Sequence, residues 1–311
     1  MTTVAEVVAD WNAANPGIQV TSTKWDGAAA ELIVKLETDV RAGEAACLAQ
    51  AGYAEVPNLY TKGMLEDVTQ YASQYTGNFS EGTMGMMTVG ETVVGLPQDT
   101  GPLVYYYDQA AFAELGIELP TTSDEFLAAA ETAAAAGKYI IDFQPDEAAY
   151  WLSALAASAG ATWYSVENDA WKVEANGDET QIMATFLQSL LDADAALTNN
   201  RWDDSFGEAL INGELIGHIG AAWEAPLLAD TMAEAPSAGN WQVAQLPDFG
   251  AGQMSGPDGG SGVVVLSGCP HPEEALAFAN WFNTQIDPLV SQGLVVAATT
   301  GAMKTPDALA E

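Results

Sequence analysis

The sequence has 311 residues, of which 49 % are hydrophobic, so it is long enough for two domains with sizeable cores. It carries 43 acidic and 8 basic residues, which gives a formal net charge of −35. Nucleic acids and anionic membranes are bound through basic patches, so this charge argues against both as partners. It favours a neutral or cationic small ligand, although a solvated acidic surface without functional meaning is the simpler interpretation.

The N-terminus and the two cysteines leave alternatives open. The residues after Met1 have neither the basic start nor the apolar core of an export signal, which fits a cytoplasmic protein or an exported one whose signal is not in this sequence. No apolar run reaches the ~18 residues of a membrane span. Cys47 and Cys269 can pair in a secreted protein or stay free, and their spacing does not suggest a zinc site. We expect no metal ion and no cofactor.

Helical and strand patterns alternate over the first third of the chain, which is typical of an α/β protein. Apolar stripes predict the helices, and alternating or continuous apolar runs predict the strands. The predicted elements are a helix over 4–14, a strand over 18–24, a helix over 27–40, a strand over 47–52, a loop and helix over 53–62, a helix opening at 65–68, and a strand over 92–96.

A polar loop that becomes an aromatic strand follows at 95–108. Its prolines suit a loop, its residues Gln98, Asp99 and Thr100 offer hydrogen-bonding groups, and 103–107 is a good strand. The later predicted elements are helices over 109–115, 126–136, 181–195, 203–212, 223–232 and 272–283, an apolar Ala-rich stretch over 146–160, a hairpin at 171–177, strands over 216–221, 241–246 and 263–266, and a Gly/Pro-rich linker over 247–262.

No motif for nucleotide binding or nucleophilic catalysis is present. A glycosidase needs paired carboxylates, and Asp203 and Asp204 with Asp99 are available. With 43 acidic residues, however, any one pair is a poor signal, and solvated or capping carboxylates are the simpler interpretation. His218 lies within an apolar run, which favours a core histidine.

The aromatic residues carry the strongest functional signal. Several of the 9 Trp and 10 Tyr stand in polar, loop-like segments beside acidic residues, among them Trp25, Tyr53, Trp202 and Trp223. A flat ring covers the C–H face of a pyranose, while a neighbouring acid or amide accepts hydrogen bonds from its hydroxyls. Each ring alone is more simply a packing residue, but the set together indicates a carbohydrate site.

Five segments in chain order carry a resemblance to a known family: 15–20, 95–108, 206–223, 259–262 and 272–282. Together they resemble the extracellular solute-binding proteins of carbohydrate ABC importers, the maltose-binding-protein-like family 1. Asp108 stands where the family usually has Asn. The acidic bias and residues 47–50 are most similar to members from Gram-positive actinobacteria.

The resemblance implies an α/β, two-lobe periplasmic-binding-protein-like fold (type II). Each lobe would be a mixed sheet flanked by helices, with the ligand cleft between the lobes. Lobe one would comprise 1–104 plus 262–311, and lobe two 105–261. We expect the chain to lack the family's first strand and its C-terminal helices. In this fold the strand that starts at Cys47 runs antiparallel to the strand that ends before Cys269, which implies a disulfide between these two residues.

The resemblance also implies a non-enzymatic, monomeric protein that captures a sugar or oligosaccharide by hinge closure and hands it to a membrane permease. It would be extracellular and anchored as a lipoprotein. Trp223 is the expected stacking platform and Asp99 the expected hydroxyl acceptor. A secreted glycoside hydrolase and a binder of a cationic, non-sugar ligand stay as alternatives. The implied ligand contacts are Trp25, Asp26, Gln50, Tyr53, Glu55, Asp99, Trp151, Trp202, Asp203, Trp223, Gly259 and Gly260.

Overall fold

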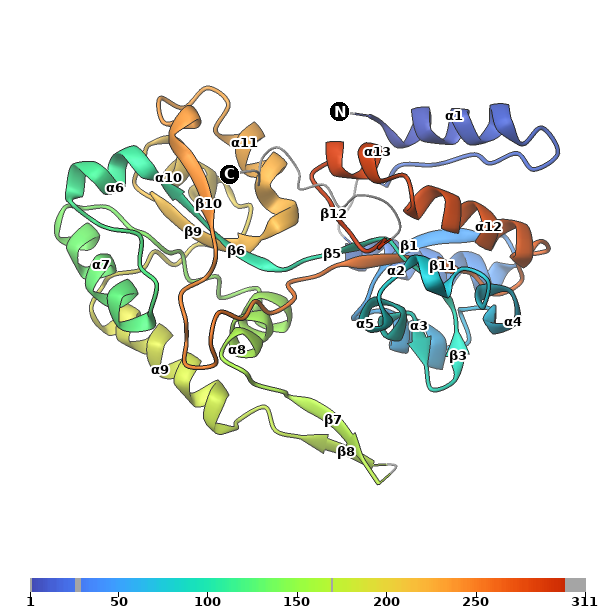
Figure 1. The fold of residues 1–311 in the computed structure, drawn as a ribbon, viewed down its shortest axis with the longest axis horizontal. Helices are drawn as coiled ribbons and strands as arrows, with labels where there is room; N and C mark the ends of the chain where they lie inside the picture. The colour runs from blue at the N-terminus through green and yellow to red at the C-terminus, as the bar shows by residue number, and fades with distance from the viewer. Residues whose placement is uncertain (1, 26–28, 169, 300–311) are drawn as a thin grey trace. The chain divides into compact units, whose positions relative to one another are not determined.

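The chain forms two compact units. The computed structural model describes residues 2–25, 29–168 and 170–299. Unit 1 holds the described residues up to Thr100 and those from Gly259 onward, and unit 2 holds Gly101–Asp258. Each unit combines a β-sheet with helices, which confirms the predicted α/β class (Figure 1). The lobe boundaries expected at 104/105 and 261/262 lie a few residues later in the chain than the boundaries of these two units. The expected boundaries stay a prediction.

Three antiparallel strands form the main sheet of unit 1. In sheet order they are β1 (Leu48–Gly52), β11 (Ser261–Val265) and β4 (Gly95–Pro97). Successive side chains of a strand point to opposite faces, so β11 serves two cores: Val263 and Val265 pack in one, and Val264 in the other. The sheet is therefore buried on both faces.

Helices cover both faces of this sheet. Leu276 of α12 joins the core of Val263, and Leu36 of α2 joins the core of Val264. α1 and α12 lie side by side (Figure 1), with Trp11 against Phe278 at 5.4 Å between ring centroids. The helices of unit 1 are α1 (Val4–Ala14), α2 (Ala29–Ala42), α3 (Val56–Thr61), α4 (Thr69–Ala72), η1 (Thr76–Asn78), α5 (Glu81–Met86), α12 (Pro272–Asn283) and α13 (Ile286–Ser291).

Two short strand pairs complete unit 1. β2 (Thr88–Val89) and β3 (Thr92–Val93) form a hairpin. β5 (Asp99–Thr100) pairs with β12 (Val295–Val296), and this pairing fixes the backbone of Asp99. The predicted polar loop at 98–100 is thus held in a β-bridge directly after β4.

Unit 2 has its own three-stranded antiparallel sheet. In sheet order the strands are β10 (Trp241–Ala244), β6 (Leu103–Asp108) and β9 (Gly217–Ala221). Neighbouring residues of β6 again serve two cores, because Tyr105 packs with Phe126 and Tyr106 packs with Phe206. Single parallel bridges, such as Tyr139 with Leu215, occur outside these named strands.

Two helices of unit 2, α6 (Gln109–Leu115) and α7 (Ser123–Ala135), start at side-chain caps. Asp108 at the end of β6 accepts the Ala111 N–H at 3.0 Å and so caps α6, which explains the abrupt change from strand to helix. The helical elements are α6 (Gln109–Leu115), α7 (Ser123–Ala135), η2 (Ala148–Leu152), α8 (Ser153–Ser158), α9 (Asp178–Asp192), α10 (Asp204–Ile211), η3 (Ala222–Glu224), α11 (Ala225–Thr231) and η4 (Ala238–Asn240).

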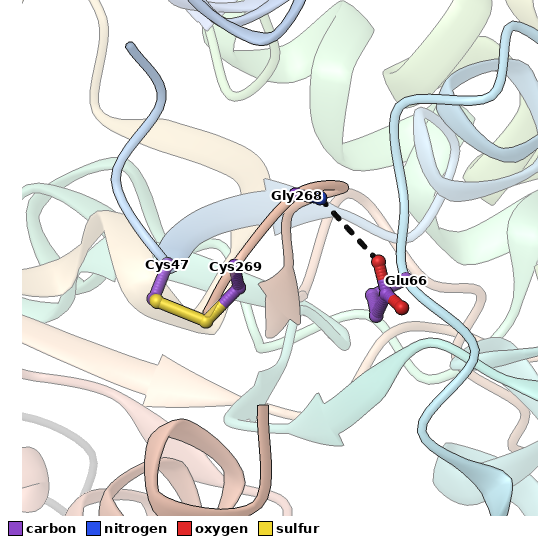
Figure 2. Close-up of a disulfide and its surroundings, with 4 residues drawn as sticks. All are labelled: Cys47, Glu66, Gly268 and Cys269. Atoms are coloured by element: carbon purple, nitrogen blue, oxygen red, sulfur yellow. Dashed lines mark hydrogen bonds between the residues drawn. A yellow bond between two sulfur atoms is a disulfide. The ribbon is translucent and has the colours of Figure 1, made fainter. Parts of the chain in front are cut away.

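The predicted disulfide is present. Cys47 and Cys269 are bonded, with their Cα atoms 4.7 Å apart and a sequence separation of 222 positions. Figure 2 shows the bond beside the turn at Gly268, whose N–H donates to Glu66 at 3.4 Å. The reason is the predicted antiparallel pairing of β1 with β11, in which Leu48 lies opposite Val265.

Three predicted elements are wrong. Residues 18–24 form no strand, because the backbone of Ile18 and Val20 is bonded by the side chains of Trp11 and Asn12 in place of a neighbouring strand. Residues 65–68 form no helix: Leu65 is bridged to Leu266, and α4 begins only at Thr69. The hairpin expected at 171–177 is built by β7 (Tyr164–Glu167) and β8 (Ala170–Val173).

Candidate functional site

Two indole rings lie together on unit 2. Trp223 is half-buried in η3, directly after β9, and Trp202 is 39 % exposed just before α10. Their ring centroids are 6.4 Å apart and their planes are tilted by 39°. Trp202 has a φ of 66°, a left-handed conformation that is uncommon for a residue other than glycine. The sequence therefore holds two accessible rings at the end of one strand and the start of one helix.

The Trp223 ring is fixed at its edge and over one face. Its Nε1–H donates to the backbone carbonyl of Asp258 at 2.9 Å. The guanidinium carbon of Arg201 lies 5.8 Å from the ring centroid, within reach of a cation–π interaction. Trp223 therefore has a defined orientation while part of its surface stays open to solvent.

Buried charged side chains lie around the Trp223 ring. The Arg201 side chain is 3 % exposed and donates to Asp258 Oδ2 at 2.6 Å and to Gln144 Oε1 at 2.9 Å. Its Nη1 lies 3.5 Å from Glu224 Oε1. Glu224 in turn contacts His218, with 2.9 Å between Oε2 and Nε2. His218 is fully buried, as its apolar surroundings predicted.

Two opposing effects set the pKa values in this cluster: burial disfavours the charged forms, and pairing with an opposite charge favours them. Burial raises the pKa of the Asp258 carboxyl, and the neighbouring Arg201 opposes part of this rise. Burial by itself would lower the pKa of Arg201, but Glu224 and Asp258 raise it above its ordinary value. Arg201 therefore stays cationic and supplies the charge that these two acids need in a dry environment.

Unit 1 contains a separate polar cluster. Asp99, 4 % exposed, accepts the backbone N–H and the hydroxyl of Ser261 at 2.8 and 2.6 Å. The Tyr53 hydroxyl donates to the Asp99 carbonyl at 2.8 Å. The exposed Gln50 donates to Gln98 Oε1 at 2.7 Å and to the Ser261 hydroxyl at 3.0 Å. These side chains form one hydrogen-bonded network on β1, β11 and the residues after β4.

Burial shifts two acidities in this network. It raises the pKa of Asp99 to about 6, although both hydrogen bonds from Ser261 act in the opposite direction. Burial also raises the pKa of the Tyr53 hydroxyl, and the Asp99 charge adds to this effect. Asp99 therefore changes its charge near neutral pH, whereas Tyr53 stays a neutral donor.

The other predicted ligand-binding residues lie at several separate positions in the chain. Trp25 is 38 % exposed, and Asp203 is exposed at the N-cap of α10. The carboxylate of Glu55 lies against Gly52, where an added Cβ would be 2.2 Å from Oε2. Gly259 and Gly260 have φ angles of 78° and 94°, in the left-handed region that favours glycine. Asp26 lies outside the described residues.

The prediction that Trp151 contacts the ligand is wrong. It is fully buried in the core of unit 2, and its Nε1–H donates to the carbonyl of Ile219 at 2.8 Å. A ring without exposed surface and with its donor satisfied cannot stack on a ligand, so Trp151 is a core residue. The Ala-rich apolar stretch in which it stands already favoured this packing role.

Sequence reasoning missed three polar residues of these clusters: Arg201, Asp258 and Ser261. Arg201 carried a signal, because a basic residue is rare in this chain and it precedes the accessible Trp202. Asp258 stands in the Gly/Pro-rich segment and Ser261 directly after it, where no local pattern distinguishes a structural carboxylate or hydroxyl from a solvated one.

The described ranges contain no group of three or more His, Cys, Asp or Glu side chains placed to hold a metal ion. In the same ranges, no helix is both long and apolar enough to cross a membrane.

The chain is similar to solved structures of sugar-binding proteins. One is the galacto-N-biose-/lacto-N-biose I-binding protein of an ABC transporter from Bifidobacterium longum in complex with lacto-N-biose. It is 55 % identical, with a TM-score of 0.94, over 99 % of this chain and 77 % of that one. No curated protein sequence matches the chain.

Two further structures share the fold at lower identity. The ABC transporter associated binding protein from B. animalis subsp. lactis Bl-04, in complex with beta-1,6-galactobiose, is 23 % identical with a TM-score of 0.80, over 95 % of this chain and 73 % of that one. The cyclic alpha-maltosyl-1,6-maltose binding protein from Arthrobacter globiformis is 19 % identical with a TM-score of 0.78, over 96 % and 77 %. These likenesses support the two-lobe, maltose-binding-protein-like fold. The family model of bacterial extracellular solute-binding proteins matches residues 1–285, and together with the relative at 55 % identity this shows that the chain belongs to that family.

Proposed function

We propose that the chain captures an oligosaccharide outside the cell and delivers it to the permease of an ABC importer. The family and the relative at 55 % identity, solved with lacto-N-biose, support this function. The observation that carries it is the Trp223 ring, which is oriented by Asp258 and Arg201 and is partly open beside Trp202. A preoriented ring with an open surface suits the C–H face of a pyranose.

The two clusters offer complementary chemistry. Unit 2 supplies aromatic surface, whereas unit 1 supplies the exposed Gln50 as a hydrogen-bonding group, and the partner of Gln50, Ser261, also bonds the buried Asp99. An uncharged sugar needs both kinds of contact, since its hydroxyls lose hydrogen bonds to water on binding. We therefore retain Trp25, Gln50, Tyr53, Glu55, Asp99, Trp202, Asp203, Trp223, Gly259 and Gly260 as proposed ligand-binding residues. The hinge closure expected for this family stays a prediction.

Localisation and partners follow the family. An extracellular protein that feeds a membrane permease must stay near its membrane, so we propose a lipoprotein anchor in the native form. A monomer with one ligand site is the simplest arrangement for delivery to a single permease. Gel filtration of the purified chain tests the oligomeric state, because a monomer elutes at the size of one 32.6 kDa chain.

Neither alternative function gains a supporting observation. The matched family and the relative at 55 % identity are ligand-binding proteins of transporters, and no enzyme family is indicated. The charge of −35 attracts cations in general, but the two buried carboxylates next to Trp223, those of Asp258 and Glu224, are already paired with Arg201 or His218. A cationic ligand would therefore find no unpaired charge at the buried carboxylates of Asp258 and Glu224.

Isothermal titration calorimetry tests the proposal. Lacto-N-biose is the first probe, followed by beta-1,6-galactobiose, maltose and the polyamine spermidine. We expect saturable heat with at least one sugar and none with spermidine. Heat with spermidine alone would contradict sugar capture and favour the cationic ligand. If chromatography shows that the protein cleaves a sugar that it binds, the glycoside hydrolase alternative is favoured.

A further inference from the structure

The Arg201 side chain contacts both Trp223 and the residue that orients it. Its guanidinium lies over the Trp223 ring, 5.8 Å from the centroid, and donates to the Asp258 carboxylate at 2.6 Å. The carbonyl of the same Asp258 accepts the indole N–H of Trp223. Arg201 is thus joined to the ring directly and through Asp258.

The guanidinium has little freedom to move. Nε donates to Gln144 Oε1 at 2.9 Å, Nη2 donates to Asp258, and Nη1 lies 3.5 Å from Glu224 Oε1. Two hydrogen bonds and one ion pair around a planar fork fix both its position and its plane. Because the side chain is only 3 % exposed, Arg201 has almost no surface to offer a ligand.

The partners of Arg201 are also fixed. Asp258 donates its N–H to the Gly101 carbonyl at 2.7 Å, and Glu224 accepts the Ala221 N–H at 2.8 Å. Glu224 is the next residue after Trp223, so the backbone on that side of the ring is held by the same cluster. The orientation of Trp223 therefore depends on a buried charge network and not on apolar packing alone.

We propose that Arg201 is a positioning residue for sugar binding, which sets the orientation of the Trp223 ring without touching the ligand. This inference rests on the proposed function, because it takes Trp223 as the stacking platform. Lysine cannot replace arginine here, since a point charge on a flexible stem cannot donate along the two fixed directions of Nε and Nη2 or cover the ring with a plane. The charge itself would be retained, so Arg201→Lys separates orientation from charge.

The test compares wild type with Arg201→Lys and with Arg41→Lys as the matched control. Arg41 lies on α2 of unit 1, 67 % exposed, in an ion pair with Glu37. Calorimetric titration with lacto-N-biose should show at least about tenfold weaker binding for Arg201→Lys and no change for Arg41→Lys. In a Trp223→Ala background, Arg201→Lys should cause no further loss of affinity, because the residue through which it acts is gone.

A spectroscopic measurement reports on the ring without a ligand. The two indoles, at 6.4 Å, are close enough for exciton coupling in circular dichroism. The difference between each protein and its Trp223→Phe form isolates the contribution of Trp223. We expect this couplet in wild type and in Arg41→Lys, and a couplet reduced by at least about half in Arg201→Lys.

Several results would overturn the inference. An unchanged couplet in Arg201→Lys means that Arg201 does not orient the ring, whatever the affinity. An additional loss of affinity in the Trp223→Ala background means that it acts on binding independently of the ring. If wild type binds no sugar, the proposed function fails, and the couplet alone decides whether Arg201 orients Trp223.

A second variant covers the case in which Arg201→Lys does not fold. Gln144→Met removes the acceptor of the Arg201 Nε–H without removing a charge, and the Gln144 Nε2 it eliminates has no partner among the described residues. It should reduce the couplet and the affinity in the same direction and to a smaller extent. A folded Gln144→Met protein with the wild-type couplet would contradict the inference.

Discussion

The Asp99 carboxylate accepts two hydrogen bonds from one residue, the N–H of Ser261 at 2.8 Å and its hydroxyl at 2.6 Å. Ser261 is the first residue of β11, so the contact ties the centre strand of unit 1 to the short strand β5. The carboxylate nevertheless keeps a pKa of about 6, since burial outweighs both hydrogen bonds. Its charge at neutral pH is therefore maintained at a cost to stability.

The first prediction is that Asp99 makes unfolding pH-dependent. Its folded pKa of about 6 exceeds the ordinary value of 3.8, so the folded state binds the proton more tightly. This contribution to the free energy of unfolding is fully present below about 3.8 and is lost as the pH rises through about 6. The change is on the order of 2–3 kcal/mol. Asp99→Asn should flatten the dependence, as measured by urea denaturation between pH 4 and pH 7.

Two comparisons isolate this effect. Asp142, whose pKa burial also raises to about 6, adds to the dependence of wild type, so Asp99→Asn should remove only part of it. Asp10→Asn, on the exposed side of α1, should leave the dependence unchanged. Parallel curves for wild type and Asp99→Asn would show that Asp99 has the same acidity in the folded and unfolded chains.

The second prediction concerns the stacking platform. Trp223→Ala removes the oriented ring and should weaken lacto-N-biose binding at least tenfold, or about 1.4 kcal/mol, in calorimetric titration. Trp171→Ala serves as the control, because Trp171 is 75 % exposed on the β7–β8 hairpin and joins no ring contact with Trp223 among those described. Equal affinities for wild type and Trp223→Ala would assign stacking to another ring.

Most of the architecture could be predicted from the sequence, since it depends on local patterns. The aliphatic run of β11, the helical run of α6, and the helix stripe of α12 all follow from residue type and spacing. The prediction of a strand at 18–24 failed because the structure of this segment depends on contacts outside it. Alternation predicts an extended backbone, but a strand also needs a partner, and side chains of α1 bond this backbone in its place.

The candidate site could be predicted only in part. Trp223 and Asp99 stand out in the sequence as an aromatic and a polar residue in loop-like segments, and their contact with a ligand stays a prediction. Arg201 and Asp258 could not be paired from the sequence, because 57 positions separate them and their contact depends on how unit 2 closes around its core. Trp151 was misassigned since an aromatic residue followed by an apolar run has the same local pattern whether or not the fold buries it.

The third prediction is that the disulfide stabilises the fold. Replacing Cys47 and Cys269 together with serine should lower the free energy of unfolding by about 5 kcal/mol, because the bond joins residues 222 positions apart and so closes a long loop in the unfolded chain. Thermal denaturation with and without reductant measures the effect. Reductant should lower the midpoint of wild type and leave that of the double-serine variant unchanged. A reductant effect on both proteins would mean that something other than this bond is being reduced.

The fourth prediction tests whether the packing around Gly220 of β9 helps to hold Trp223 in place. A Cβ on Gly220 would lie 2.5 Å from His218 Nε2 and 2.6 Å from Glu224 Oε2. Neither side chain can yield freely, since His218 packs on Phe206 at 5.2 Å between ring centroids and Glu224 is bonded by the Ala221 N–H. Gly220→Ala should therefore cost about 1–3 kcal/mol of unfolding free energy, as overpacking usually does.

The control for this substitution is Gly239→Ala, where nothing lies within 4 Å of the added Cβ. It should leave the thermal midpoint within experimental error of wild type. Gly220→Ala should also weaken sugar binding, because displacing Glu224 moves the residue next to Trp223 and a partner of Arg201. Unchanged stability and affinity in Gly220→Ala would show that the His218–Glu224 pair shifts without resistance. The ring would then owe its orientation to Asp258 and Arg201 alone.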